Sequence, residues 1–488
     1  MTRVISLAAV MIMTFATIVV VSKVATTAGL VPDDAVVLWA NAITAGDGQM
    51  SIGRIVAAYP TIPFLATCML EFLAPSGTPT PVLLTAGVLA AFAGALSVAF
   101  RRLGLPPIAA LPMVFLIVLH PAMLRAAIAG PAEMILSVFW FLLGSALFGL
   151  RARSAAAEVM AVALSLLGLA FSHPMGAAIA CAAIPLLVFS VRPELLSSRV
   201  LNVVLTLIFP TAFCVVAFSY MSWVFPGSGW SFLMEPAEGI ATWAAGFSDL
   251  FGRGLTGSLE LDAAIAVVVT LVVAAPVVPF VLVRVWGRRP LAIPILVMIA
   301  MTAMAAGLAV LTGLFGDPAP VAVMPPLLAA LVIIHVPQVR ERLAIVLPLL
   351  LLGWLGGFVG LALVDPRGAI NVSVTLKGRD VDTDRLAAIN LGSATLGRNG
   401  ILVDTFNAPA VVLGRGDARG LLGPSDETFT LGVLFSRIDA PFVAVPDPQI
   451  GIGARDRLNR AFPLLYRRGA AGYRLIYDNA NWRMFART

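Results

Sequence analysis

Two adjacent carboxylates, Asp33 and Asp34, follow the first apolar segment of the chain and are its clearest candidates for chemistry. A carboxylate at the depth of a lipid phosphate can take a proton from a hydroxyl group, or hold a divalent cation against the phosphate. The alternative is that the pair only caps a solvated helix. The residues themselves leave both interpretations open.

A second acid, Glu133, follows the turn that carries His120, Pro121 and Arg125. Pro131 suits the first turn of a helix, and Glu133 stands where a carboxylate interacts favourably with the helix dipole. This is a complete structural explanation of Glu133. The functional alternative is that Glu133 is a second carboxylate in the same cleft as Asp33 or Asp34.

The other candidates for binding a substrate are scattered over the segments between apolar runs. They are Arg54, Tyr59, His173, Arg253 and Asp317. The tryptophans of residues 223–262 (Trp223, Trp230 and Trp243) fit an interfacial belt, or alternatively a surface on which a sugar stacks. The three histidines lack metal-ligand spacing, and the three cysteines form no C-x-x-C pair. No cofactor is certain, and a divalent cation is one alternative.

These residues must be positioned by a membrane protein. The chain has 488 residues, of which 60% are hydrophobic and 12% charged, far from the composition of soluble domains. The net charge of +6 comes without a basic block, so no nucleic-acid partner is expected. Eleven segments have the length and apolarity of spans: 4–22, 81–100, 106–124, 131–150, 157–172, 174–191, 200–222, 263–283, 290–312, 319–336 and 343–364.

The distribution of charge predicts an orientation. With a cytoplasmic N-terminus, 12 of the 16 basic residues in 1–364 fall in cytoplasmic segments, whereas 11 of its 14 acids fall outside. An odd number of spans then places the C-terminus in the periplasm of a bacterium. The expected location is the bacterial inner membrane, with the acidic candidates on the outer face.

The chain is predicted to divide into a transmembrane module, 1–364, and a periplasmic α/β domain, 365–488. The module carries long outer loops at 25–80 and 223–262, and the apolar stretch 60–74 of the first loop predicts an interfacial helix. In the tail, strands are expected at 400–404, 410–414, 442–445, 473–477 and 482–486, and helices at 426–436 and 455–465. No nucleophile elbow, phosphate-binding loop or dinucleotide motif is present, so the tail is expected to cover or contact an acceptor.

This layout resembles the GT-C superfamily of membrane glycosyltransferases, in particular the branch of the lipid A aminoarabinose transferase and the protein O-mannosyltransferases. The likeness is carried by Asp33-Asp34 after the first span, Tyr59-Pro60 before the interfacial helix, the turn from His120 to Glu133, and the closing hairpin 473–485. The resemblance implies an inverting transferase that moves a sugar from a polyprenyl-phosphate donor to a lipid, glycan or protein acceptor at the bilayer surface.

The resemblance also implies roles for particular residues. Asp33 or Asp34 would serve the acceptor as base, with Glu133 as a second acid, and Arg54, Arg125 and Arg253 would meet the leaving phosphate. The family commonly has an Arg-Tyr pair where this chain has Phe315-Gly316-Asp317-Pro318. That departure keeps open a non-catalytic partner in envelope glycan assembly, and a transporter or flippase is the remaining alternative.

Overall fold

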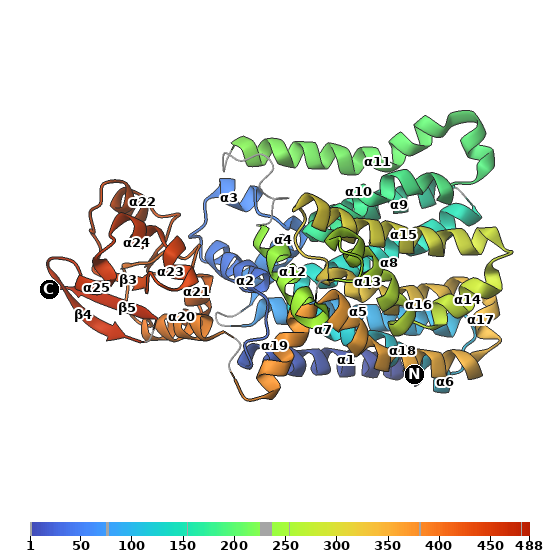
Figure 1. Ribbon diagram of the computed structural model, residues 1–488, viewed down its shortest axis with the longest axis horizontal. Coiled ribbons are helices and arrows are strands. Elements are labelled where there is room, and N and C mark those ends of the chain that lie inside the picture. The colour runs from blue at the N-terminus through green and yellow to red at the C-terminus, as the bar shows by residue number, and fades with distance from the viewer. Residues whose placement is uncertain are drawn as a thin grey trace. The chain divides into compact units, whose positions relative to one another are not determined.

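The chain folds into two compact units, which Figure 1 shows in a computed structural model. The structure describes residues 2–74, 78–153, 155–224, 237–252, 254–379, 382–479 and 481–488. Within these ranges only the backbone is described at 2–6, 193–201, 237–239 and 340. The membrane unit comprises 1–24, 59–63 and 82–376, and the C-terminal unit comprises 25–58, 64–81 and 377–488. The first outer loop therefore contributes most of its residues to the C-terminal unit, and the division after the last span falls at 376/377 instead of the expected 364/365.

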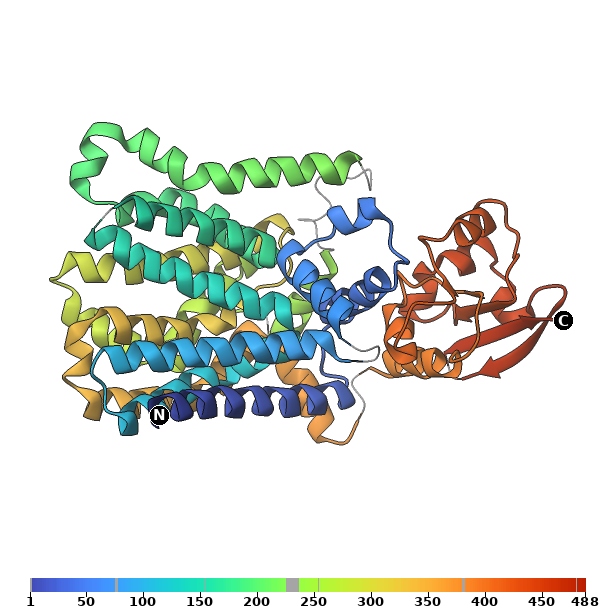
Figure 2. The same cartoon turned by 180° about the vertical axis from the view of Figure 1, so that it is seen from behind.

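The membrane unit is helical. Its elements are α1 (Thr2–Thr27), α5 (Thr80–Arg102), α6 (Pro107–Val118), α7 (Pro121–Ala129), α8 (Pro131–Ala152), α9 (Ala156–Ser172), α10 (Pro174–Ser190), α11 (Pro193–Val224), α12 (Ala237–Phe251), α13 (Leu259–Ala274), α14 (Val277–Val285), α15 (Arg289–Thr312), η1 (Ala319–Val323), α16 (Met324–His335), α17 (Pro337–Arg340), α18 (Leu343–Val364) and α19 (Pro366–Leu376). Figure 2 shows α1 alongside α5, where Gly94 of α5 approaches Met11 of α1.

Among the described residues, six helices are long and apolar enough to cross a membrane, or eight if each of two bent pairs is one span. The six lie in α1, α5, α8, α11, α15 and α18, and the bent pairs are α6 with α7 and α13 with α14. The remaining three predicted spans correspond to α9, α10 and η1 with α16, which are apolar but shorter. All eleven predicted segments are thus helical, but only six to eight of them are both long enough and apolar enough to cross a membrane.

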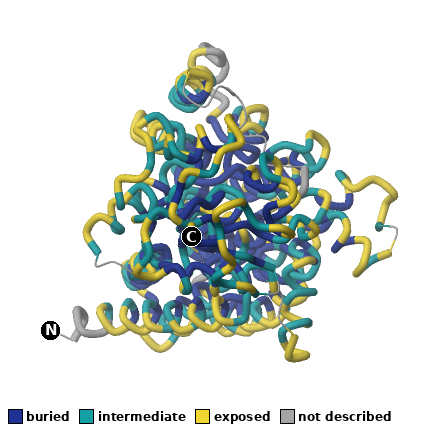
Figure 3. Tube along the Cα trace, turned by 90° about the vertical axis from the view of Figure 1, so that its left-hand side faces the viewer, coloured by how far each residue is buried: buried dark blue, intermediate teal, exposed yellow. Residues whose placement is uncertain are grey.

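Apolar side chains cover the outside of this unit as well as its interior. In Figure 3, which colours each residue by its burial, buried residues gather toward the interior and exposed residues line the outer helices. On α11 the exposed side chains include Leu205, Phe209, Phe213, Val216 and Tyr220, which recur at helical spacing. Such a surface is unfavourable in water and is expected against lipid tails. The chain is a multi-pass helical membrane protein.

Glycines allow α18 to pack closely against α13. A Cβ atom at Gly356 would lie 2.2 Å from the carbonyl oxygen of Val273, and one at Gly353 would lie 2.6 Å from that of Ala274. One turn further along α18, the Thr270 hydroxyl donates a hydrogen bond to the carbonyl of Gly360 at 3.1 Å. Small residues let transmembrane helix backbones approach in this way.

We therefore expect Gly356→Ala to destabilise the membrane unit by about 1–3 kcal/mol, because the two helices must separate to admit the methyl group. The measurement is the temperature at which the detergent-purified protein loses its monodisperse peak in size-exclusion chromatography. Gly87→Ala in α5 is the matched control, since a Cβ atom there would have no neighbour within 4 Å. Equal stability of the two variants would contradict close packing at Gly356.

The C-terminal unit is built on a five-stranded sheet in the order β2-β1-β3-β5-β4. Strands β1, β2 and β3 are parallel, and β5 pairs antiparallel with β3 and β4. Its elements are α2 (Asp33–Gly46), α3 (Ile52–Val56), α4 (Thr61–Leu73), α20 (Thr383–Ala394), β1 (Ile401–Leu402), α21 (Pro409–Arg415), β2 (Leu421–Leu422), α22 (Glu427–Leu434), β3 (Phe442–Pro446), α23 (Gly451–Arg455), α24 (Arg457–Ala461), α25 (Leu465–Arg468), β4 (Tyr473–Asp478) and β5 (Trp482–Arg487).

Four of the five expected strands are present, and one is wrong. Residues 410–414 lie in α21, which begins with Pro409 at its first position and ends at Gly416 in the left-handed conformation. Proline at the start and glycine just past the end are typical of a helix, and here they override an apolar run that resembles a strand. The short strand β2, Leu421–Leu422, lies outside the five predicted strands.

The first outer loop is held in this unit by apolar and ionic contacts. Val36, Ala40 and Ile43 of α2 are buried in one hydrophobic cluster with residues of α20 and α21. The Asp47 carboxylate accepts a hydrogen bond from the backbone of Ala418 at 2.7 Å and pairs with Arg419 at 3.0 Å. The loop is therefore a structural part of the unit that carries the sheet.

The apolar stretch of the first loop forms a helix, α4, as predicted. Its Leu65, Met69, Phe72 and Leu73 are exposed and lie on one face by their spacing, whereas Phe64 is buried. An exposed apolar stripe on a short helix fits a position at a bilayer surface.

Candidate functional site

An arginine and two carboxylates are joined at one end of the membrane unit. Arg125 lies on α7, and Glu133 lies in the first turn of α8. Gly130 connects the helices at φ 104°, a conformation that favours glycine, and Pro131 then begins α8. Nη1 of Arg125 pairs with Glu133, and its Nε donates to Oδ2 of Asp365 at 2.7 Å. The sharp turn between α7 and α8 thus brings residues eight positions apart into contact.

All three side chains of this Arg125 cluster are largely buried, with 19% of Arg125, 7% of Glu133 and 15% of Asp365 exposed. The charge of Asp317 also acts on Arg125 and Glu133. One guanidinium therefore interacts with three carboxyl groups. Because two carboxylates already occupy Arg125, this geometry gives it a positioning role.

His173 and Asp317 border the Arg125 cluster and also organise local backbone. His173 Nδ1 accepts a hydrogen bond from the backbone of Met175 at 3.0 Å, which caps α10, and its ring feels the charge of Arg125. Asp317 accepts one from the backbone of Ala319 at 3.0 Å. The structure thus gathers Glu133, Arg125, His173 and Asp317 of the predicted set.

His120 and Tyr59 are engaged with backbone groups of the membrane unit. His120 Nδ1 accepts from the backbone of Ala122, and its Nε2 lies 3.2 Å from the carbonyl oxygen of Gly353. The Tyr59 hydroxyl donates to the carbonyl of Ala170 at 2.8 Å. A substrate contact by either ring would have to replace one of these bonds.

Asp33, Asp34 and Arg54 belong to the C-terminal unit, whereas Glu133 belongs to the membrane unit. Asp33 and Asp34 are the first two residues of α2, and both are exposed. The Asp33 carboxylate pairs with Arg385 at 2.5 Å. Arg54 stacks on the ring of Phe406 and donates to the hydroxyl of Ser425 at 3.2 Å. The N-cap of α2 is Pro32, so Asp33 and Asp34 are acids of the first helical turn and not the capping residue, and their exposure is compatible with the catalytic interpretation.

Some expectations for the outer segments change. Trp243 is 2% exposed, and its Nε1 donates to the carbonyl of Val364 at 3.1 Å, so it is a core residue and not a surface for a sugar. Arg253 and Trp230 lie outside the described residues. Within the described ranges no group of three or more histidine, cysteine, aspartate or glutamate side chains could hold a metal ion.

Asp365 was missed by the sequence reasoning, which assigned it to the tail. Its signal was its place directly after the last span, on the same predicted face as Arg125. Arg457 was missed as well: its guanidinium lies 5.4 Å from the centroid of the Phe406 ring, on which Arg54 also stacks. No local spacing connects Arg457 with Arg54, so only folding pairs them.

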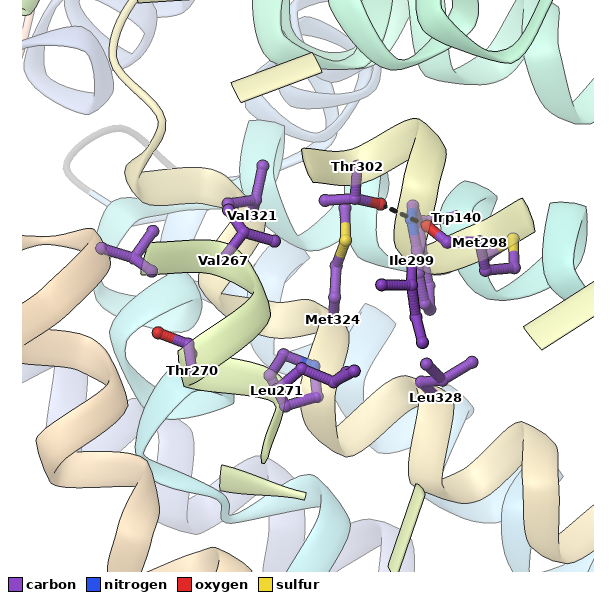
Figure 4. A pocket seen from close by; sticks show the side chains of 12 residues that line it. Trp140, Val267, Thr270, Leu271, Met298, Ile299, Thr302, Val321, Met324 and Leu328 are labelled. Carbon is purple, nitrogen blue, oxygen red and sulfur yellow. Dashed lines mark hydrogen bonds between the residues drawn. The ribbon is translucent and has the colours of Figure 1, made fainter. Parts of the chain in front are cut away.

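One cavity inside the membrane unit is too small for a substrate. A cavity of about 10 Å³ lies among α8, α13, α15, η1, α16 and α18. Figure 4 shows it lined by apolar side chains around Trp140, Thr302 and Met324, with Thr302 hydrogen-bonded to Met298. That volume admits about one water molecule. An open groove of about 410 Å³ along α13 and α15, lined mainly by apolar groups, offers more space.

No protein-family model matches the chain, and the search of curated proteins found no significant match.

Proposed function

We propose that this protein is an inverting membrane glycosyltransferase of the GT-C type, which moves a sugar from a polyprenyl-phosphate donor to a lipid, glycan or protein acceptor. The observation that carries the proposal is the Arg125 cluster, in which Glu133, Asp365 and Asp317 surround one arginine at the end of an apolar helical unit. Buried carboxylates are costly in such a unit and mark functional sites. The open groove beside Glu260 fits a lipid tail that enters between helices.

We further propose that all eleven apolar segments cross the bacterial inner membrane, with the N-terminus in the cytoplasm and the sheet-bearing unit in the periplasm. Arginines in the last turns of α5 and α8 (Arg101, Arg102 and Arg151) support this orientation, because in alternating spans these ends lie opposite the Arg125 cluster. The acidic cluster then faces the periplasm, where the acceptor is glycosylated.

In the proposed reaction an acceptor hydroxyl attacks the anomeric carbon of the sugar. The bond from that carbon to the phosphate oxygen breaks, and polyprenyl phosphate leaves with the bonding electrons. The proton of the hydroxyl passes to a carboxylate, for which Asp33 and Asp34 are the candidates. Glu133, held by Arg125, is the second acid, and Arg54, Tyr59, His120, His173, Arg253 and Asp317 remain candidates for substrate contacts.

We expect Asp34→Ala and Asp33→Ala to lower sugar transfer by about 100-fold or more, the usual contribution of a general base. Both proteins should still accumulate in the membrane, because Asp33 and Asp34 are exposed and an exposed ion pair such as Asp33–Arg385 contributes about 0–1 kcal/mol. Transfer is measured by mass spectrometry in membranes supplied with polyprenyl-phosphate sugars. Asp249→Ala, which removes an exposed acid of α12, is the control. Wild-type transfer by both single variants and the double variant would refute the base assignment.

A transporter is the second candidate, and the bent helix pairs favour it. The helices α13 and α14 meet at 92°, and α6 and α7 at 49°. Broken helices are common where transporters bind substrate. Gradient-driven uptake into vesicles without sugar transfer would support this alternative, and neither activity would favour a non-catalytic partner in envelope glycan assembly.

A further inference from the structure

Two arginines of the C-terminal unit meet on one aromatic ring. The guanidinium carbon of Arg54 lies 3.9 Å from the centroid of Phe406, and that of Arg457 lies 5.4 Å from the same point. Arg54 is contributed by α3 of the first outer loop, and Arg457 by α24 of the tail. Both guanidinium groups therefore lie beside the same ring, and the charge of Arg457 acts on Arg54.

Neither guanidinium forms an ion pair within the part of the chain that the structure describes; Arg54 donates only to the Ser425 hydroxyl. The pKa of Arg54 is lowered, first by burial and then by the charge of Arg457. Other arginines of this unit do have carboxylate partners: Arg385 with Asp33, Arg415 with Asp417, Arg419 with Asp47, Arg483 with Asp478, and Arg487 with Asp439. Two like charges held together without a counter-charge are unfavourable unless an anion joins them.

The arginine pair lies where the parallel strands end. Phe406 follows β1, and Ser425 follows β2. The two turns are close, because a Cβ atom at Gly423 would lie 2.5 Å from Oγ1 of Thr405. The carboxyl ends of parallel strands are the usual position for a ligand in an α/β sheet.

The turn after β1 also positions the second arginine. The buried Asp404 carboxylate accepts hydrogen bonds from the backbone of Arg457 at 3.0 Å and from the Asn407 amide at 2.7 Å. It therefore fixes the start of α24 through the backbone and leaves the Arg457 side chain, which is exposed, able to bind a ligand.

We propose that Arg54, Arg457 and the Ser425 hydroxyl bind a phosphate-bearing ligand beside the Phe406 ring. The planar guanidinium group matches phosphate oxygens with two parallel hydrogen bonds, and two such groups suit a phosphate dianion or a pyrophosphate. The ligand is either a lipid head group or a soluble phosphate compound. All of these residues lie in the C-terminal unit. A lipid ligand would be the polyprenyl phosphate of the proposed reaction and so rests on the proposed function, whereas a soluble phosphate ligand would be independent of sugar transfer.

The test measures binding to the full-length protein in detergent. One arm titrates inorganic pyrophosphate by calorimetry, and the other follows polyprenyl phosphate by native mass spectrometry, with unphosphorylated polyprenol as the comparison. We expect at least one phosphate ligand to bind, and Arg54→Ala and Arg457→Ala each to weaken it about tenfold or more. Arg474→Ala, which removes an exposed arginine of β4, should leave binding unchanged. Binding of polyprenyl phosphate would identify the ligand as a lipid head group, and binding of pyrophosphate would identify it as a soluble phosphate compound.

A folding control separates binding from structure. Because Arg54 and Arg457 repel each other, removing either should leave the thermal stability near that of the wild type. The lysine variants Arg54→Lys and Arg457→Lys keep the charge but lose the paired hydrogen bonds, so they should bind with intermediate affinity. Failure of both phosphate ligands to bind the wild type, or equal binding by the alanine variants, would overturn the site while leaving the glycosyltransferase proposal to its own transfer assay.

Discussion

Arg125→Met is expected to destabilise the membrane unit by about 3–5 kcal/mol, the usual result of removing one partner from a buried ion pair. Methionine replaces the aliphatic part of the arginine side chain. It leaves the carboxylates of Glu133 and Asp365 without the guanidinium that now pairs with both. Their burial prevents water from replacing it fully. The effect should appear as a lower thermal stability in detergent and less protein accumulated in membranes.

Two comparisons make the Arg125 result specific. Arg102→Met, in the last turn of α5, removes an exposed arginine of the same unit and should have little effect. The triple variant Arg125→Met, Glu133→Gln, Asp365→Asn replaces the arginine and its two paired carboxylates with neutral side chains and should recover most of the lost stability. If Arg125→Met were as stable as the wild type, the Arg125 cluster would not hold α7, α8 and the end of α18 together.

Asp456→Asn is expected to remove a pH dependence from the stability of the C-terminal unit. Burial first and the neighbouring charge of Asp404 next raise the pKa of Asp456 to about 7, against the backbone hydrogen bonds of Asn459 and Leu458 that lower it. Its Oδ1 accepts from the backbone of Asn459 at 2.8 Å, whereas its Oδ2 is buried and has no hydrogen-bond partner. The site therefore favours a protonated carboxyl.

The direction of the Asp456 effect follows from linkage. Below the ordinary aspartate pKa, 3.8, the folded and unfolded chains are both protonated; between 3.8 and about 7 only the unfolded chain has lost the proton. The wild type should thus lose roughly 3–5 kcal/mol across this window as pH rises, and Asp456→Asn should not. Pulse proteolysis in urea measures this free energy. Asp426→Asn changes the cap of α22 in the same way and should keep the wild-type decline.

Much of the fold follows from local patterns. Apolar runs of span length predicted the helices α1, α5 to α11, α13 to α16 and α18, because burial of the backbone in lipid requires helices, whereas α12, α17 and α19 were not predicted. Apolar runs predicted β1, β3, β4 and β5. The prediction was wrong at 410–414, where proline and glycine at the two ends favour the helix α21. Apolarity alone also does not give the number of spans, because several helices are close to the minimum length for crossing a membrane.

The candidate site was predictable only in part. Gly130-Pro131 and Glu133 predicted the start of a helix, and the charge distribution predicted that most acids of 1–364 lie on the outer face of the membrane. The ion pair between Glu133 and Arg125 could be predicted from the sequence, because the two residues are only eight positions apart and a turn lies between them. The second partner, Asp365, lies 240 positions from Arg125, and Arg54 reaches Ser425 across 371 positions. No spacing rule connects such residues.

By itself, the sequence determined that this is a multi-pass helical membrane protein with a small α/β unit at its C-terminus, because hydropathy and charge are properties of contiguous segments. Only the tertiary structure decided that the first outer loop packs with the tail, that Arg125 is occupied by carboxylates, and that Arg54 meets Arg457. Those outcomes depend on which distant side chains share a buried volume, where an unpaired charge or exposed apolar face is costly. The free-energy cost of an unpaired charge or an exposed apolar face depends on contacts between distant segments, so the sequence of one segment does not reveal it.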